Sequence, residues 1–251
     1  MSLVATELQW GYTPTDFFEA RCAVALGCGA LELDDGKATL RLTAPTDPVP
    51  TFIREQASAA VADVFNARRL LVHRDFTLQG PHMIQLEDNG KRHIAVAIDS
   101  LNIKVAMGTV DVLVTNSRGE VVRDSRAERL TEHLRFVTDV AAKAGKSPLL
   151  RRLLQSYGAA VGDPNDELVH LYEIRDALAE YFKSDARARS TLGITKVEWN
   201  LLGRLANAEP LEQGRHRGQH ANSARPATID ELRTARENAR LLVEGFAKKI
   251  P

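Results

Sequence analysis

Apolar and polar positions in the first part of the chain follow a period of two, which is the pattern of β-strands. Residues 20–33 are rich in Ala, Val and Leu, and residues 37–43 alternate apolar with polar side chains. Asp35-Gly36 lies between these runs, and an Asp-Gly pair favours a tight turn because glycine accepts a positive φ at no steric cost. The pattern therefore predicts a hairpin over residues 17–43.

One helix and several further strands are predicted after this hairpin. Apolar residues at three- and four-residue spacings over Thr51–Asn66 indicate an amphipathic helix. Turn signals such as Gly80-Pro81 then separate short β-type runs at residues 70–78, 83–86, 93–98, 103–114 and 120–122. A meander of strands covered by one helix is typical of an α+β domain.

From Arg126 onward the apolar period changes from two to about 3.6, which predicts helices. The first of these helices covers residues 126–144. Four more helices have start signals, at Ser147-Pro148, Asp163-Pro164, Thr195 and Thr228. Each signal is a capping residue that is followed by Pro or, three residues later, by an acidic residue. About five helices therefore follow the β-rich half.

The two patterns together predict an α+β protein with two domains. We expect an α+β domain with an antiparallel sheet over residues 1–125 and an all-α helical bundle over residues 126–251. The chain has 251 residues, which is long enough to bury a core in each domain.

Composition narrows the location of the protein more than its function. The 33 basic residues balance the 33 acidic ones, so any attraction to nucleic acid has to be local. The first residues lack the features of a secretory signal, and no apolar run is long enough to span a bilayer. Cys22 and Cys28 have no second pair with which to form a zinc site. These features predict a cytoplasmic protein with reduced cysteines, no metal, no cofactor and no membrane association.

Candidate chemistry is concentrated in one polar segment, residues 214–226, between the last two predicted helices. It has the sequence Gly-Arg-His-Arg-Gly-Gln-His-Ala-Asn-Ser-Ala-Arg-Pro and gathers three arginines and two histidines. The connection between the two helices is long for neighbours in a bundle, and ordered loops of this length are usually functional. The segment is therefore the first place to look for an anion-binding or catalytic site.

Arg215 and His220 in this segment have the spacing Arg-x4-His, which resembles the Arg-x(4–6)-His motif of the HEPN superfamily. These are small helical-bundle domains of bacterial toxin, abortive-infection and RNA-processing systems. Residues 171–178 (LYEIRDAL) are similar to the first long helix of that family, and the Thr-x-x-Glu helix that follows Arg225-Pro226 is similar to abortive-infection-like proteins. The resemblance covers about residues 147–250. In the family the motif sits at the start of a helix, whereas here the surrounding glycines predict a loop.

The resemblance implies a metal-independent ribonuclease that needs no cofactor and acts as a homodimer in which two copies of the motif face each other. His220 would be the general base or acid, because an unperturbed histidine titrates near pH ~6.5. Arg215 would clamp the phosphate and stabilise the charge that develops on phosphorus. The same hypothesis assigns contacts with RNA or another anion to His216, Arg217 and Arg225, and base stacking to Tyr172 or Trp199.

Two other interpretations stay open. In the first, the chain is a non-catalytic interaction protein: its helical bundle binds a partner or a small anion, and its N-terminal domain is a sensor or binds a protein partner. The polar segment is then a solvated loop whose arginines contact the carbonyl end of the preceding helix. In the second, an enzyme site lies around His73 and Asp75, which share a face if residues 70–78 form a strand, so that the carboxylate orients the imidazole.

Overall fold

The computed structural model describes residues 3–88, 92–95, 111–115, 118, 120–215 and 223–251. The chain divides into two compact units. Unit 1 contains residues 1–65 and 76–142, and unit 2 contains residues 66–75 and 143–251. An antiparallel sheet in the first unit and helices in the second confirm the predicted α+β class. The division falls inside helix α2 (Ser125–Ala144) rather than before it, and a ten-residue piece of the N-terminal half belongs to the helical unit.

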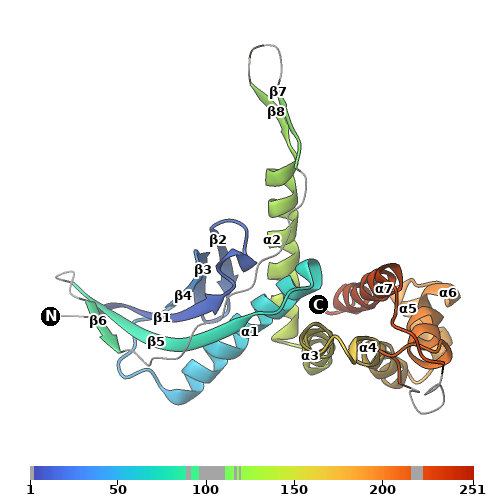
Figure 1. Ribbon diagram of the computed structural model, residues 1–251. Coiled ribbons are helices and arrows are strands. Elements are labelled where there is room, and N and C mark those ends of the chain that lie inside the picture. The colour runs from blue at the N-terminus through green and yellow to red at the C-terminus, as the bar shows by residue number, and fades with distance from the viewer. Residues whose placement is uncertain (1–2, 89–91, 96–110, 116–117, 119, 216–222) are drawn as a thin grey trace. The chain divides into compact units, whose positions relative to one another are not determined.

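Unit 1 is built on a six-stranded antiparallel sheet with the order β2-β3-β4-β1-β5-β6. Figure 1 shows its two longest strands, β1 and β5, running side by side. The strands are β1 (Leu3–Thr13), β2 (Cys22–Leu26), β3 (Gly29–Asp34), β4 (Lys37–Leu42), β5 (Thr77–Glu87) and β6 (Arg92–Ala95). Helix α1 (Thr51–Val72) connects β4 to β5.

The core of unit 1 lies on one face of this sheet. Leu8, Trp10 and Tyr12 of β1 are buried at every second position, because successive side chains of a strand point to opposite faces. Phe65 of α1 packs against the ring of Tyr12 and stacks on Phe17 with an interplanar angle of 10°. Aromatic packing therefore fixes the helix on the sheet. Strand β1 occupies a central place, although the sequence analysis predicted no strand before residue 17.

The predicted hairpin is confirmed at its turn and corrected in its first strand. Asp35 and Gly36 both have positive φ, 39° and 75°, which is the conformation that an Asp-Gly turn requires. Residues 20–33, however, form two strands, since Leu26 pairs with Gly29 across a second tight turn. Gly80-Pro81 is also not a turn: it lies inside β5 at an irregularity of the β1–β5 register.

The strand predicted over residues 70–78 is wrong in its first half. Leu70 is buried and belongs to α1, which continues to Val72. The chain then leaves the helix at His73, whose φ is 44°, and β5 begins only at Thr77. A short apolar run such as Leu70-Leu71-Val72 suits a helix end as well as a strand, and periodicity alone does not separate them. His73 and Asp75 therefore do not share the face of a strand.

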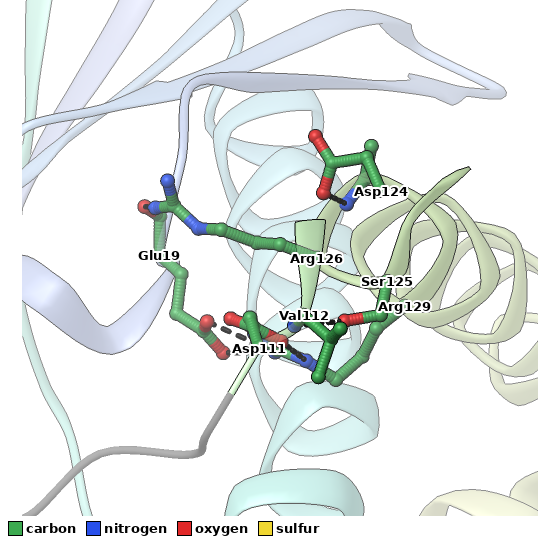
Figure 2. A network of polar contacts seen from close by, with 8 residues as sticks. Glu19, Asp111, Val112, Asp124, Ser125, Arg126 and Arg129 are labelled. Carbon is green, nitrogen blue, oxygen red and sulfur yellow. Dashed lines mark hydrogen bonds and ion pairs between the residues drawn. The ribbon is translucent and has the colours of Figure 1, made fainter. Parts of the chain in front are cut away.

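Unit 1 also contains most of helix α2 and the hairpin of β7 (Leu113–Thr115) and β8 (Val121–Asp124). Figure 2 shows how the base of this hairpin is held. Arg129 of α2 donates hydrogen bonds to both carboxylate oxygens of Glu19, at 2.9 and 3.0 Å, and to both of Asp111, at 2.8 and 3.3 Å. The Val112 amide donates to the Ser125 hydroxyl at 2.7 Å. One arginine thus ties three segments of unit 1 together.

Unit 2 is a bundle in which α4 contacts α3, α6 and α7. Its elements are α3 (Pro148–Gly162), α4 (Glu167–Phe182), α5 (Asp185–Leu192), α6 (Lys196–Gly203), the π-helical turn η2 (Arg204–Ala208) and α7 (Ile229–Ala247). The helix starts predicted at Ser147, Thr195 and Thr228 are confirmed, and both capping boxes are formed. No helix among the described residues combines the length and apolarity that crossing a bilayer requires.

Two predictions in this half need correction. Asp163-Pro164 does not start α4, because Asp163 closes α3 through a backbone bond to the Ala159 carbonyl, and α4 begins at Glu167. The same helix ends at Phe182, since Lys183 takes up a left-handed conformation. Ser184 then caps the short helix α5, for which no helix was predicted.

Candidate functional site

The polar segment leaves and rejoins the helical unit at two fixed points. The Arg215 amide donates to the Ala206 carbonyl at 2.7 Å, and the Arg225 amide donates to the Pro210 carbonyl at 2.9 Å. Leu211 and Arg225 form an isolated parallel bridge. Of the predicted site residues, Arg215 and Arg225 lie at these anchors, whereas His216, Arg217 and His220 lie outside the described residues.

Gly214, just before Arg215, sits in a backbone crossing that has no room for a side chain. A Cβ atom there would lie 2.9 Å from the Ala206 carbonyl oxygen and 3.1 Å from that of Leu211. Both neighbours are backbone atoms and cannot turn away. The direction in which Arg215 leaves the bundle is therefore set by this close approach.

The Arg215 guanidinium lies over an aromatic ring of α4. Its central carbon is 4.9 Å from the centroid of the Tyr172 ring, within the range of a cation–π contact. Arg175, three residues further along α4, approaches the same ring at 5.9 Å, because residues three apart share a helix face. Arg215 is exposed and Tyr172 half-buried, so ligands can reach this cluster from solvent.

A hollow of about 330 Å³ opens beside Tyr172, between α4 and the consecutive elements α6 and η2. Its lining residues are Tyr172, Arg175, Asn200, Gly203, Arg204 and Ala208. We call these residues together with Arg215 the arginine hollow. Arg175 is paired with Asp185 at 2.6 Å and Arg204 with Glu209 at 3.6 Å, while no carboxylate among the described residues contacts Arg215. Arg215 is therefore the arginine of the hollow whose guanidinium is not paired with a described carboxylate, and it lies on an aromatic ring, which suits an anion with a flat group.

Trp199 is not a platform for base stacking in this structure. The side chain is 1% exposed, and Arg175 covers its ring at 4.9 Å. Of the two aromatic residues that the sequence analysis considered for stacking, only Tyr172 is accessible.

Arg225 is engaged in the start of α7. Its guanidinium donates to both carboxylate oxygens of Glu231, at 2.7 and 2.8 Å. Glu231 also accepts from the Thr228 amide in the capping box. These hydrogen bonds lower the pKa of Glu231 to about 2, and the bond from Arg225 has the largest effect. An anion would have to displace Glu231 to reach Arg225, so the role predicted for Arg225 conflicts with its present partner.

His73, Tyr157, Glu167 and Arg236 form a polar cluster in unit 2, in which Tyr157 and Glu167 are buried and the other two residues are half-buried. The His73 ring lies 3.2 Å from the Tyr157 hydroxyl through Nδ1 and 3.5 Å from Glu167 through Nε2. Arg236 donates to both oxygens of Glu167, at 2.5 and 2.8 Å, and the Glu167 side chain is 2% exposed. This cluster anchors residues 66–75 to the helices of the same unit.

The cluster does not have the properties of a base catalyst. Burial, and then the charge of Arg236, lower the pKa of His73 to about 4, and burial raises the pKa of Tyr157 to about 12. A histidine with a pKa near 4 holds a proton poorly at neutral pH. Asp75, the expected partner of His73, instead pairs with Arg69 at 2.5 Å. The hypothesis of a His73–Asp75 site is therefore not supported by this geometry.

Three residues of the arginine hollow, Arg175, Asn200 and Arg204, were not predicted as site residues. The spacing of Tyr172 and Arg175 was a usable signal, since it places both on one helix face. Asn200 and Arg204 gave no comparable signal, because only the packing of α6 against α4 brings them to Tyr172. The described residues contain no group of three or more His, Cys, Asp or Glu side chains arranged to hold a metal ion.

Comparison of the chain with models of protein families, with curated proteins and with solved structures gives no match. The site has therefore to be interpreted from its own chemistry.

Proposed function

We propose that the helical unit binds single-stranded RNA at the arginine hollow and cleaves it as a HEPN-like, metal-independent endoribonuclease. The observation that carries the proposal is the position of Arg215. Its guanidinium lies on Tyr172 at a hollow lined by two more arginines, at the point where the chain enters the segment with His220. Clustered arginines contact phosphates, and an accessible aromatic ring stacks a base.

The proposed reaction gives His220 and Arg215 separate roles. A 2′-hydroxyl gives its proton to His220, its oxygen bonds to phosphorus, and the P–O5′ bond breaks. The leaving 5′-oxygen takes a proton from His220 of the partner subunit, so the products are a 2′,3′-cyclic phosphate and a 5′-hydroxyl. Arg215 stabilises the negative charge on the phosphoryl oxygens while this happens. A homodimer supplies both histidines, and it is part of the proposal.

The test uses the full chain, a labelled single-stranded RNA and a buffer with a metal chelator. Arg215→Ala and His220→Ala are compared with Arg187→Ala, which removes an exposed arginine of α5 outside the hollow. We expect cleavage by the parent and by the control and none by the two site variants. Absence of cleavage by the parent, or full cleavage by both site variants, contradicts the nuclease assignment.

Binding without cleavage is the second candidate function. Its support is that Arg225 is paired with Glu231, and that the described start of the motif lies outside a helix. A titration of the same RNA at two salt concentrations separates the candidates, because phosphate contacts give a steep salt dependence. Salt-sensitive binding that needs Arg215, with no cleavage, favours this second candidate. A parent that binds no RNA favours an interaction protein with another partner.

A further inference from the structure

A second hollow, of about 500 Å³, lies at the far end of α7 from the polar segment. It is formed by the start of α3, the end of α4 and the residues that follow α7, all within unit 2. Its chemistry is carried by three aromatic residues, two lysines and a helix cap: Tyr181, Phe182, Phe246, Lys146, Lys249 and Ser147. We call it the aromatic–lysine hollow.

The three aromatic rings support one another edge to face. Tyr181 meets Phe182 at 5.1 Å and 87°, and it meets Phe246 at 5.4 Å and 81°. Phe246 is 4% exposed, whereas Tyr181 is 59% exposed. A ring that its neighbours hold at the edges, with most of its surface open, is a ready platform for another flat group.

The charges around this platform favour an anion. Lys146 and Lys249 are both exposed, and no Asp or Glu side chain is among the described residues that line the hollow. The first turn of α3, capped by the Ser147 hydroxyl at 3.2 Å from the Leu150 amide, adds a partial positive charge. At the end of α7 the carbonyls of Phe246 and Ala247 already accept from Lys249 and Ile250. They therefore present less negative charge to a ligand.

We infer that the aromatic–lysine hollow binds a nucleotide. The base stacks on Tyr181, and the phosphate lies among Lys146, Lys249 and the start of α3. A purely apolar ligand would leave the two lysines unused, and inorganic phosphate would leave the exposed ring unused. A ligand that combines a flat aromatic group with a compact anion uses both the exposed ring and the lysines.

Two sources could supply this nucleotide: a free mononucleotide, or one residue of an RNA strand. The second source deepens the proposed function and rests on it. The two hollows lie near opposite ends of α7, whose 19 residues span about 28 Å at 1.5 Å per residue. A short RNA then reaches one hollow at a time, and a longer strand reaches both.

Isothermal titration of the full chain with adenosine 5′-monophosphate, uridine 5′-monophosphate and inorganic phosphate tests the first source. We expect both nucleotides to bind more tightly than phosphate. Tyr181→Ala should weaken nucleotide binding at least about fivefold, the lower bound for losing one stacked base. Tyr181→Phe keeps the ring and should retain binding, and Lys249→Glu should weaken it while the matched charge change Arg187→Glu does not. Equal nucleotide affinity in Tyr181→Ala, Lys249→Glu and the parent overturns the free-nucleotide source.

The RNA source is tested with single strands of about 4 and about 16 nucleotides, the range that one binding module covers. Tyr181→Ala should reduce the affinity gained by the longer strand and leave cleavage at the arginine hollow intact. If Tyr181→Ala changes neither nucleotide nor RNA binding while Arg215→Ala abolishes cleavage, the inference fails and the proposed function stands. If Tyr181→Ala weakens nucleotide binding while Arg215 and His220 prove dispensable, the inference stands and the proposed function fails.

Discussion

Arg215 and Arg225 stand at the two ends of the same polar segment, and the structure gives them different partners. Arg225 donates two hydrogen bonds to Glu231 and completes the start of α7. Arg215 lies on the Tyr172 ring and contacts no carboxylate among the described residues. An aromatic ring leaves the donors of a guanidinium available to a phosphate, whereas a bidentate carboxylate occupies them. The partner of an arginine, more than its place in a motif, indicates which one is available for binding.

Arg236, a half-buried arginine whose partner Glu167 is buried, extends this comparison and gives the largest expected effect. Arg236→Ala leaves the Glu167 carboxylate, 2% exposed, without its two strongest donors. Removing one partner of a buried pair costs about 3–5 kcal/mol of unfolding free energy. Urea denaturation should show this loss. Arg233→Ala, which breaks the exposed pair with Asp230, should stay close to the parent. Equal stability of both variants would contradict the structural role of Arg236.

Arg215→Ala should have the opposite profile, with a large effect on function and little on stability. Loss of a donor that stabilises transition-state charge lowers the cleavage rate by about 100-fold or more. Because Arg215 is exposed, the midpoint of urea denaturation should not move measurably. Single-turnover cleavage and denaturation of the same preparation check both halves. If Arg215→Ala lost stability together with activity, Arg215 would have a structural role like that of Arg236.

The lowered pKa of His73 predicts that the stability of the protein depends on pH. The folded state holds the pKa of His73 near 4, below its ordinary value of 6.5, so the unfolded chain binds more protons between these values. Stability is therefore fully present above pH 6.5 and falls as the pH is lowered towards 4, by about 2 kcal/mol at pH 5. Urea denaturation at pH 7 and pH 5 measures the loss. His73→Gln should reduce this difference. An unchanged difference in His73→Gln would show that other groups cause it.

Arg225→Ala should have the smallest effect and should sharpen the comparison with Arg215. Glu231 keeps its bonds to Thr228 in the capping box, so only an exposed ion pair is lost and the midpoint of urea denaturation should change little. We expect RNA affinity to change far less than in Arg215→Ala, because Arg225 already has a partner. A binding titration on both variants checks this. If Arg225→Ala loses as much affinity as Arg215→Ala, ligand binding takes Arg225 away from Glu231.

The sequence was sufficient for features with a strong local cause. The capping boxes at Thr195 and Thr228 and the Asp35-Gly36 turn formed as predicted, because each depends on residues within a few positions. Strand β1 was missed although Leu8, Trp10 and Tyr12 alternate in its sequence. The run at residues 70–72 was misassigned because its helical character comes from packing that a short window does not contain.

The candidate site was predictable only in part for the same reason. Arg215 stands out in the sequence by its neighbours, but the arginine hollow also depends on Tyr172 and Arg175 of α4 and on Arg204 of η2, which only the fold brings together. His73 appeared to be a partner of Asp75 because they are close in sequence. The fold instead gives it Tyr157 and Glu167, which are far away along the chain.

The backbone crossing at Gly214 has a consequence for variation of this protein. Any side chain at that position would press on the Ala206 carbonyl and shift the first residue of the polar segment. The displaced Arg215 amide would lose its bond to the same carbonyl, and the guanidinium would leave Tyr172. We therefore expect Gly214, which has no side chain, to accept no substitution wherever the arginine hollow is retained. Among relatives, glycine at this place should be inherited together with the arginine that follows it.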